Sequence, residues 1–141
     1  MVRIDVTYRG RLRCVSLHEP SGAELSTDAP KDNQGEGASF SPTDLVATAL
    51  ATCVLTTMGI VANRHGWKLD GATASVVKHM VADPIRRIGK LELTLRMPAG
   101  LDERARETLE RTAHTCPVHK SLAPNVEVPM TFLWDAVPAA H

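Results

Sequence analysis

The sequence predicts one α+β domain over residues 1–141, with its elements in the order βββ-α-ββ-αα-β. Apolar and polar residues alternate through the first thirty positions, and they alternate again over 87–97 and 126–134. Between these regions lies a long uncharged run, residues 45–62, flanked by signals for the start and end of a helix. A chain of this length is large enough to bury a core of its own.

The N-terminal region predicts two strands at residues 2–8 and 11–19. Arg-Gly at 9–10 predicts the turn between them, because glycine readily adopts turn conformations. Alternation along the second strand would place Leu12 and Cys14 on one face. Cys14 is expected to be a packing residue.

A third short strand is predicted at residues 23–27, after a Pro-Ser-Gly turn. Residues 28–40 then hold the richest cluster of Gly, Pro, Asp and Asn in the chain. Such a cluster is typical of an exposed loop.

The central helix has clear boundaries. Ser41 suits the cap, Pro42 the first helical position, and Asp44 completes an approximate capping box. Gly66 ends the helix, since glycine readily adopts the left-handed conformation of a C-terminal cap. Residues 42–65 would then extend roughly 36 Å.

This helix is apolar on most sides, so most of its circumference must be covered. One chain of 141 residues offers too little sheet and helix for that, which predicts a homodimer. Residues 45–62 also reach the lower length limit of a membrane span. However, four threonines and Gly59 lie within the run, and no second such segment exists, so a buried central helix is the better interpretation.

The second half of the chain predicts a strand pair at residues 70–82 and 87–97. A helix over 102–115 and a short helix from Pro117 follow, and the last alternating strand covers 126–134.

Composition excludes several functions. Lys+Arg equals Asp+Glu at 16 each and aromatic residues make up 4%, which argues against nucleic-acid binding and an anionic membrane surface. The charged N-terminus lacks the apolar segment of a signal peptide, and three cysteines form no disulfide framework, so a reducing cytoplasm is expected. No phosphate loop, serine elbow or carboxylate metal cluster occurs, and neither cofactor nor metal is expected.

Two cysteines carry the chemical hypotheses. Cys53 lies within the uncharged run, where a thiol alone is usually inert. Cys116 precedes Pro117 at a helix start, where the helix dipole favours the thiolate, so local sequence predicts Cys116 to ionise more easily. His119 follows one helical turn later, which suits a Cys-His hydrolase or acyl-transfer enzyme as one alternative.

The segments FSPTDLVATALATC (40–53) and CPVHKSL (116–122) together resemble the OsmC/Ohr family. The resemblance covers nearly the whole chain. It implies an OsmC-like fold, an intertwined homodimer with sites at the interface, and a thiol-dependent peroxidase that reduces organic hydroperoxides. A second alternative keeps this fold as a small-molecule-binding protein with little turnover.

The resemblance also implies roles for the two thiols. Cys53 would attack the peroxide and become a sulfenic acid, and Cys116 would resolve it to a disulfide. An external dithiol would then restore both thiols.

Two family features differ in this chain. A glutamate that orients a catalytic arginine follows the helix-opening proline in the family, whereas Thr43 stands here and Asp44 is the nearest carboxylate. The arginine itself would come from the first hairpin, where Arg9 is preferred over Arg11.

Overall fold

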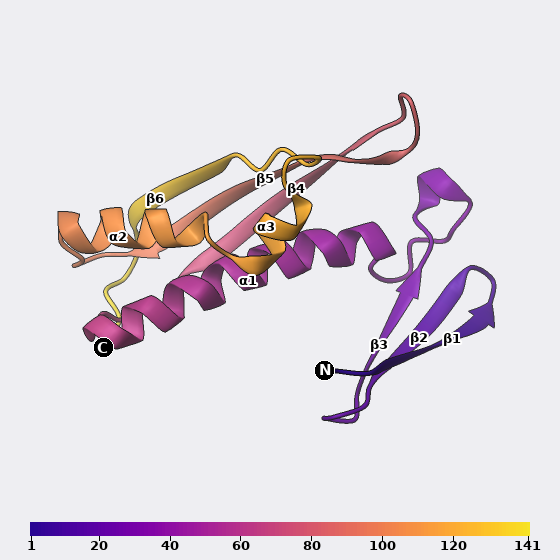
Figure 1. Ribbon diagram of the computed structural model, residues 1–141, viewed down its shortest axis with the longest axis horizontal. Coiled ribbons are helices and arrows are strands. Elements are labelled where there is room, and N and C mark those ends of the chain that lie inside the picture. Colours follow the sequence, from indigo (N-terminus) through magenta and orange to yellow (C-terminus); the bar gives the residue numbers. More distant parts are fainter. The chain divides into compact units, whose positions relative to one another are not determined.

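The computed structural model describes residues 1–141 and has an α+β architecture with the expected order of elements (Figure 1). The fold-class prediction is confirmed. The strands and helices are β1 Ile4–Gly10, β2 Arg13–His18, β3 Ala23–Asp28, the 3-10 helix η1 Lys31–Asn33, α1 Pro42–His65, β4 Thr73–Val81, β5 Arg87–Pro98, α2 Glu103–Ala113, α3 Pro117–Leu122 and β6 Met130–Val137.

Two compact units divide the chain at Val46, one comprising Met1–Val46 and the other Ala47–His141. The single domain expected over residues 1–141 stays a prediction.

The first unit contains an antiparallel sheet in the order β1-β2-β3. Its first turn lies at Arg11 and Leu12, two residues beyond the expected position, and both adopt positive φ, at 54° and 61°. This is the backbone of a two-residue hairpin turn with a favourable twist. Gly10 still belongs to β1, next to a register shift after Tyr8. Placing Leu12 on a strand face with Cys14 was therefore wrong, because Leu12 is a turn residue.

Helix α1 begins and ends where the sequence predicts. The Ser41 hydroxyl accepts the Asp44 N–H at 3.1 Å, and the Asp44 carboxylate accepts the Ser41 N–H at 2.8 Å, which completes the capping box. At the other end Gly66 has φ 73°, and the Trp67 N–H donates to the Ala62 carbonyl at 2.9 Å. This is the Schellman arrangement of a helix C-terminus.

The second unit has the sheet β4-β5-β6, with β5 in the centre, antiparallel to β4 and parallel to β6. The inward residues of β5 are almost completely buried: Leu91, Leu93, Leu95 and Met97. Strand β6 begins at Met130, four residues later than expected. The preceding Pro129 has no N–H to donate to a ladder, although its carbonyl accepts the Leu93 N–H at 2.9 Å.

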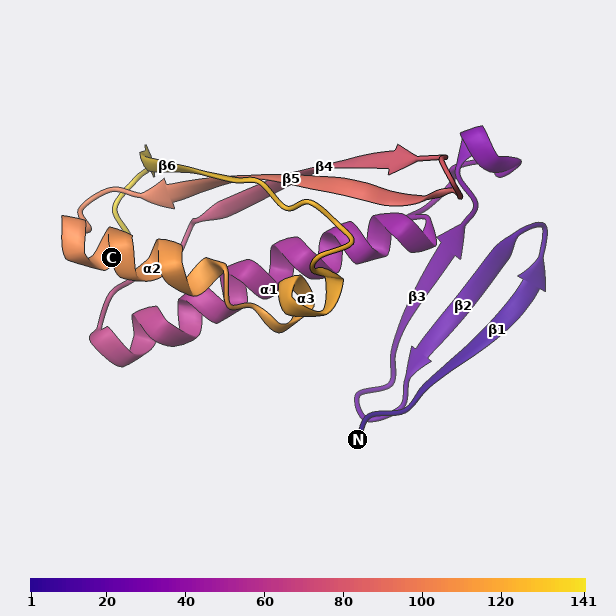
Figure 2. The same ribbon diagram turned by 45° about the horizontal axis from the view of Figure 1, so that its top comes forward.

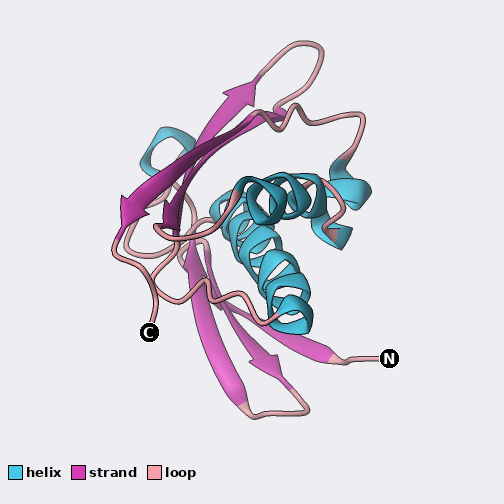
Figure 3. Cartoon of the chain, turned by 90° about the vertical axis from the view of Figure 1, so that its left-hand side faces the viewer, coloured by secondary structure: helices cyan, strands magenta, loops and turns pink.

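Helices α1 and α2 lie side by side on one face of this sheet (Figures 2 and 3). A stripe along α1 is buried, comprising Ala47, Leu50, Ala51, Val54, Met58 and Ala62. The i, i+3/i+4 spacing keeps the stripe on one side of the helix. Ile60, on another side, is 50% exposed. By length and composition alone α1 could cross a membrane, a test that core helices of soluble proteins also pass.

Helix α2 has a side-chain cap at its start and one buried apolar face. The Asp102 carboxylate accepts the Ala105 N–H at 2.8 Å. Ala105, Leu109 and Ala113 are buried on one side. Ala113 ends the helix inside the core, His114 and Thr115 after it are exposed, and the chain is buried again at Cys116.

Candidate active site

The two candidate thiols come from different elements of the second unit. Cys53 lies about three turns into α1 and is half-buried. Cys116 follows the end of α2, is 0% exposed, and serves as the N-cap of α3. Its sulfur accepts the His119 N–H at 3.2 Å.

The structure brings these two thiols together. The side chain of Cys116 and the backbone N–H of Val118 both favour the thiolate form of Cys53 and lower its pKa. The Thr57 hydroxyl lies 3.9 Å from the Cys53 sulfur, one turn further along α1. A thiolate on Cys53 would therefore be stabilised by groups from α1 and from α3.

These contacts affect the two thiols in opposite directions. Burial raises the pKa of Cys53, but hydrogen bonds from Val118, Cys116 and Thr57 outweigh it, so the pKa falls below its ordinary value. Burial also raises the pKa of Cys116. The His119 N–H only partly offsets this rise, and the neighbouring Cys53 adds to it. Cys53 is therefore the thiol that ionises more readily.

The expectation that Cys116 ionises first was wrong. It rested on the position of Cys116 at a helix start, but α3 has only six residues and Cys116 is fully buried. A short helix provides a weak dipole, and the charged form of a buried thiol loses its solvation.

The histidine beside Cys116 does not act on the thiol through its ring. The Nδ1 atom of His119 lies 3.3 Å from the His114 carbonyl oxygen. The one hydrogen bond from His119 to the Cys116 sulfur comes from its backbone N–H. The Cys116–His119 alternative therefore has no general base at the thiol in this structure.

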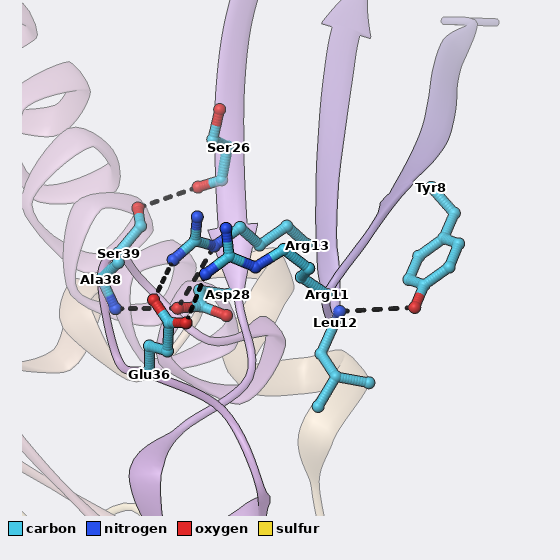
Figure 4. A network of polar contacts seen from close by, with 9 residues as sticks. All are labelled: Tyr8, Arg11, Leu12, Arg13, Ser26, Asp28, Glu36, Ala38 and Ser39. Carbon is cyan, nitrogen blue, oxygen red and sulfur yellow. Dashed lines mark hydrogen bonds and ion pairs between the residues drawn. The ribbon is translucent and has the colours of Figure 1, made fainter.

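The arginines of the first hairpin differ in their partners (Figure 4). Glu36 accepts hydrogen bonds from Arg11 at 2.7 Å and from Arg13 at 2.6 Å. Arg13 also lies 3.7 Å from the buried carboxylate of Asp28. The hydrogen bond from Arg11 is the main reason that the pKa of Glu36 is lowered. These contacts fix the loop after β3 to the β1–β2 hairpin.

Arg9 stands apart from this network. It makes no hydrogen bond or ion pair, and it lines a cavity of about 310 Å³ in the first unit. Cys14 lines the same cavity. Arg11 and Arg13 of the hairpin have carboxylate partners, whereas the guanidinium of Arg9 has none.

The remaining predicted residue, Asp44, has a visible structural use. Its carboxylate closes the capping box with Ser41, and the neighbouring Thr43 hydroxyl lies 3.2 Å from the Ser41 hydroxyl. A catalytic role for Asp44 stays a prediction.

Sequence reasoning missed two groups at the Cys53 sulfur. Thr57 carries a detectable signal, because residues four apart in a helix are neighbours. The Val118 N–H carries none, since every residue except proline has such a group. No group of three or more His, Cys, Asp or Glu side chains in residues 1–141 is arranged to hold a metal ion.

The order of elements and the neighbouring thiols define an α+β protein with one cysteine on α1 and a second at the start of α3. The family model described as OsmC-like protein matches residues 35–131. The chain therefore belongs to the OsmC-like family, as the sequence resemblance predicted.

Solved structures share this fold over almost the whole chain. A Psychrobacter arcticus 273-4 protein, provisionally named an osmotic stress induced and detoxification response protein, is 43% identical, with 94% of this chain and 96% of that chain covered and a TM-score of 0.88. An organic hydroperoxide resistance protein OsmC from Legionella pneumophila is 22% identical, with 94% and 96% covered and a TM-score of 0.77. The organic hydroperoxide resistance protein OhrB of Bacillus subtilis is 20% identical, with 94% and 97% covered and a TM-score of 0.68. No curated protein matches the chain.

The hydrogen bonds at Cys53 predict how its alkylation depends on pH. In a Cys14→Ser background, Cys116→Ser keeps a hydroxyl donor beside Cys53, whereas Cys116→Ala removes it. We expect iodoacetamide to modify Cys53 at a lower pH in the serine variant, because the donor stabilises the thiolate. Rates measured across pH by mass spectrometry would check this. Identical profiles would mean that Cys116 does not influence the ionisation of Cys53.

Proposed function

We propose that this protein is a thiol-dependent peroxidase that reduces organic hydroperoxides. The observation that carries the proposal is the placement of Cys53, with its lowered pKa, against the buried thiol of Cys116. A thiolate is the attacking species in peroxide reduction, and a second thiol nearby is needed for a disulfide. The names of relatives such as the Legionella protein support the same substrate class.

In the proposed cycle the Cys53 thiolate attacks the terminal oxygen of the hydroperoxide. The O–O bond breaks, a Cys53 sulfenic acid forms, and the leaving alkoxide takes a proton to become an alcohol. The Cys116 sulfur then bonds to the Cys53 sulfur with loss of water. An external dithiol reduces this disulfide and is itself oxidised to a disulfide.

The proposal assigns the attacking role to Cys53 on physical grounds. Three groups favour its thiolate, and Cys53 is half-buried, whereas Cys116 is fully buried. Cys116 is fully buried with a raised pKa, which suits a thiol that reacts only after its neighbour has been oxidised.

The proposal includes Arg9 as the cation that serves the thiolate and the peroxide. A thiol in the middle of a helix gains little from the helix dipole, and a nearby positive charge would further favour its thiolate. Glu36 already neutralises Arg11, whereas Arg9 has no partner.

We also propose a homodimer in the cytoplasm. Several large apolar side chains of the single chain remain more than half exposed, among them Ile4, Val6 and Tyr8 on one face of the β1-β2-β3 sheet. Exposed apolar patches of this kind mark interaction surfaces. A reducing compartment would keep both thiols ready for turnover.

The two cysteine roles can be separated by thiol titration before and after one equivalent of cumene hydroperoxide. We expect the wild type to lose two thiols and form the Cys53–Cys116 disulfide. Cys53→Ser should not react, and Cys116→Ser should stop at a sulfenic acid that further peroxide over-oxidises. If Cys116→Ser alone loses all reactivity, the roles are reversed. No consumption by the wild type, together with retention of an apolar ligand, would favour the binding-protein alternative.

The role of Arg9 can be tested by substitution with a neutral side chain of similar shape. Arg9→Gln should lower kcat/KM for cumene hydroperoxide by about 10- to 100-fold, the value of a lost charge-assisted hydrogen bond. Arg11→Gln is the matched control on the same hairpin and should cost less. The opposite ranking would move the assignment to Arg11.

The dimer can be checked by light scattering at micromolar concentration. We expect twice the mass of the 15.3 kDa chain, with an apolar interface of about 2,000 Å² or more. Ile4→Lys together with Val6→Lys should weaken the association, whereas Lys substitutions at the exposed Asp5 and Thr7 on the other sheet face should not. A wild-type monomer would remove the two-subunit site.

A further inference from the structure

The cavity of the first unit has features of a small-molecule site. It has a volume of about 310 Å³, and its lining comes from all three strands of the β1-β2-β3 sheet and from the loop after β3. Arg13 pairs with Asp28 across the sheet, and both line the cavity together with Ala38 of the loop. The volume is at the lower end of the range for ligand sites, so the ligand would be small.

The carboxylate of Asp28 is the buried polar group of this cavity, since Asp28 is 1% exposed. Its Oδ2 atom accepts the Ala38 N–H at 2.9 Å and lies 3.7 Å from Nε of Arg13 (Figure 4). The Ala38 N–H lowers the pKa of Asp28 more than burial raises it, and Arg13 lowers it further, so the group is ionised at neutral pH. The Oδ1 atom is buried without a hydrogen-bond partner. Such an oxygen is costly, which favours a ligand that donates a hydrogen bond to it.

The second group that a ligand could use is the guanidinium of Arg9. The pairing register of β1 with β2 skips Arg9, as in a β-bulge, a feature that commonly re-aims a side chain. Arg9 lines the cavity and makes no hydrogen bond or ion pair. Glu36, by contrast, already binds both Arg11 and Arg13. A carboxylate from a ligand could therefore pair with Arg9 without competing with a protein group.

The charges around the cavity decide which ligand fits. Three arginines face two carboxylates in the cavity lining and the adjoining network, so one positive charge remains: Arg9, Arg11 and Arg13 against Asp28 and Glu36. This surplus disfavours a cation, and the Asp28 carboxylate would repel an anion that has no donor group. A carboxylate that also carries a hydroxyl group supplies one negative charge and one donor. An amino acid would leave the positive charge uncompensated, because it has no net charge.

We propose that this cavity binds small hydroxy carboxylates, with the carboxylate at Arg9 and the hydroxyl group donating to Oδ1 of Asp28. The donors of a guanidinium match both oxygens of a carboxylate, and a hydrogen bond to an ionised acceptor is stronger than one between neutral groups. Val15 adds apolar surface for a short alkyl group. The cavity shares Arg9 with the proposed peroxidase site, but binding there does not depend on the peroxidase function.

The first test compares lactate with two analogues that each lack one contact. Propionate lacks the hydroxyl group, and lactamide lacks the charge. Binding can be followed by NMR through the amide of Ala38, which donates to the Asp28 carboxylate. We expect lactate to bind about ten-fold more tightly than propionate, as for a hydrogen bond to a charged group, and about two- to five-fold more tightly than lactamide, as for an exposed ion pair. No response of Ala38 to lactate, or equal affinity for all three compounds, would overturn the proposal.

The second test assigns each contact to one residue. Asp28→Asn keeps the shape of the side chain but removes the charged acceptor, so the preference for lactate over propionate should fall close to one. Arg9→Gln should remove the preference for lactate over lactamide and leave the preference over propionate. Arg3→Gln is the matched control, because Arg3 pairs with Asp5 and does not line the cavity. It should change neither preference. Equal losses in all three variants would refute the assignment.

Asp28 also holds the loop after β3, so the thermal midpoint of Asp28→Asn shows whether this variant is folded. If it is not, the three compounds on the wild type and on Arg9→Gln still decide the proposal. No peroxide is present in these measurements. Lactate binding by a protein that consumes no peroxide would refute the peroxidase function alone. Peroxide consumption without lactate binding would refute the cavity proposal alone.

Discussion

The burial of one stripe of α1 against the β4-β5-β6 sheet is the interaction on which the second unit depends. Leu50, Val54 and Met58 are 0% exposed, as is Leu91 of the central strand. Each such side chain contributes about 1.5–3 kcal/mol when it leaves water. Since Cys53 directly precedes Val54, burial of the stripe fixes the rotation of the helix and with it the direction of the thiol. The core therefore sets the geometry of the site.

The electrostatics of the site depend on two elements, the middle of α1 and the start of α3. Helix α1 contributes a thiol in its middle, where its own N–H groups are already bonded within the helix. The start of α3 contributes N–H groups that have no partner inside that helix, and the Val118 and His119 groups donate to the two sulfurs. Groups from both helices thus contribute to lowering the pKa of Cys53.

Local sequence signals determined most of the architecture. The capping box at Ser41 and the terminating Gly66 placed α1 to the residue, and alternation along β5 predicted its buried face. The first turn was misplaced because Arg11 and Leu12 adopt positive φ without any residue preference that reveals it. The ionisation order of the thiols was also missed. It depends on the burial of Cys116 and on a contact across 63 positions of sequence, which no local pattern encodes.

The Cys116 sulfur is the N-cap of α3, and in the proposed function it is also the atom that bonds to Cys53. As the N-cap it accepts the His119 N–H and thereby holds the first turn of α3 in place. Any bond or oxygen added to that sulfur changes its capacity as an acceptor, and the loss of a cap costs a helix about 0.5–2 kcal/mol. A helix of six residues has little cooperativity with which to absorb that loss. The backbone order of residues 117–122 is therefore thermodynamically linked to the chemical state of one sulfur atom.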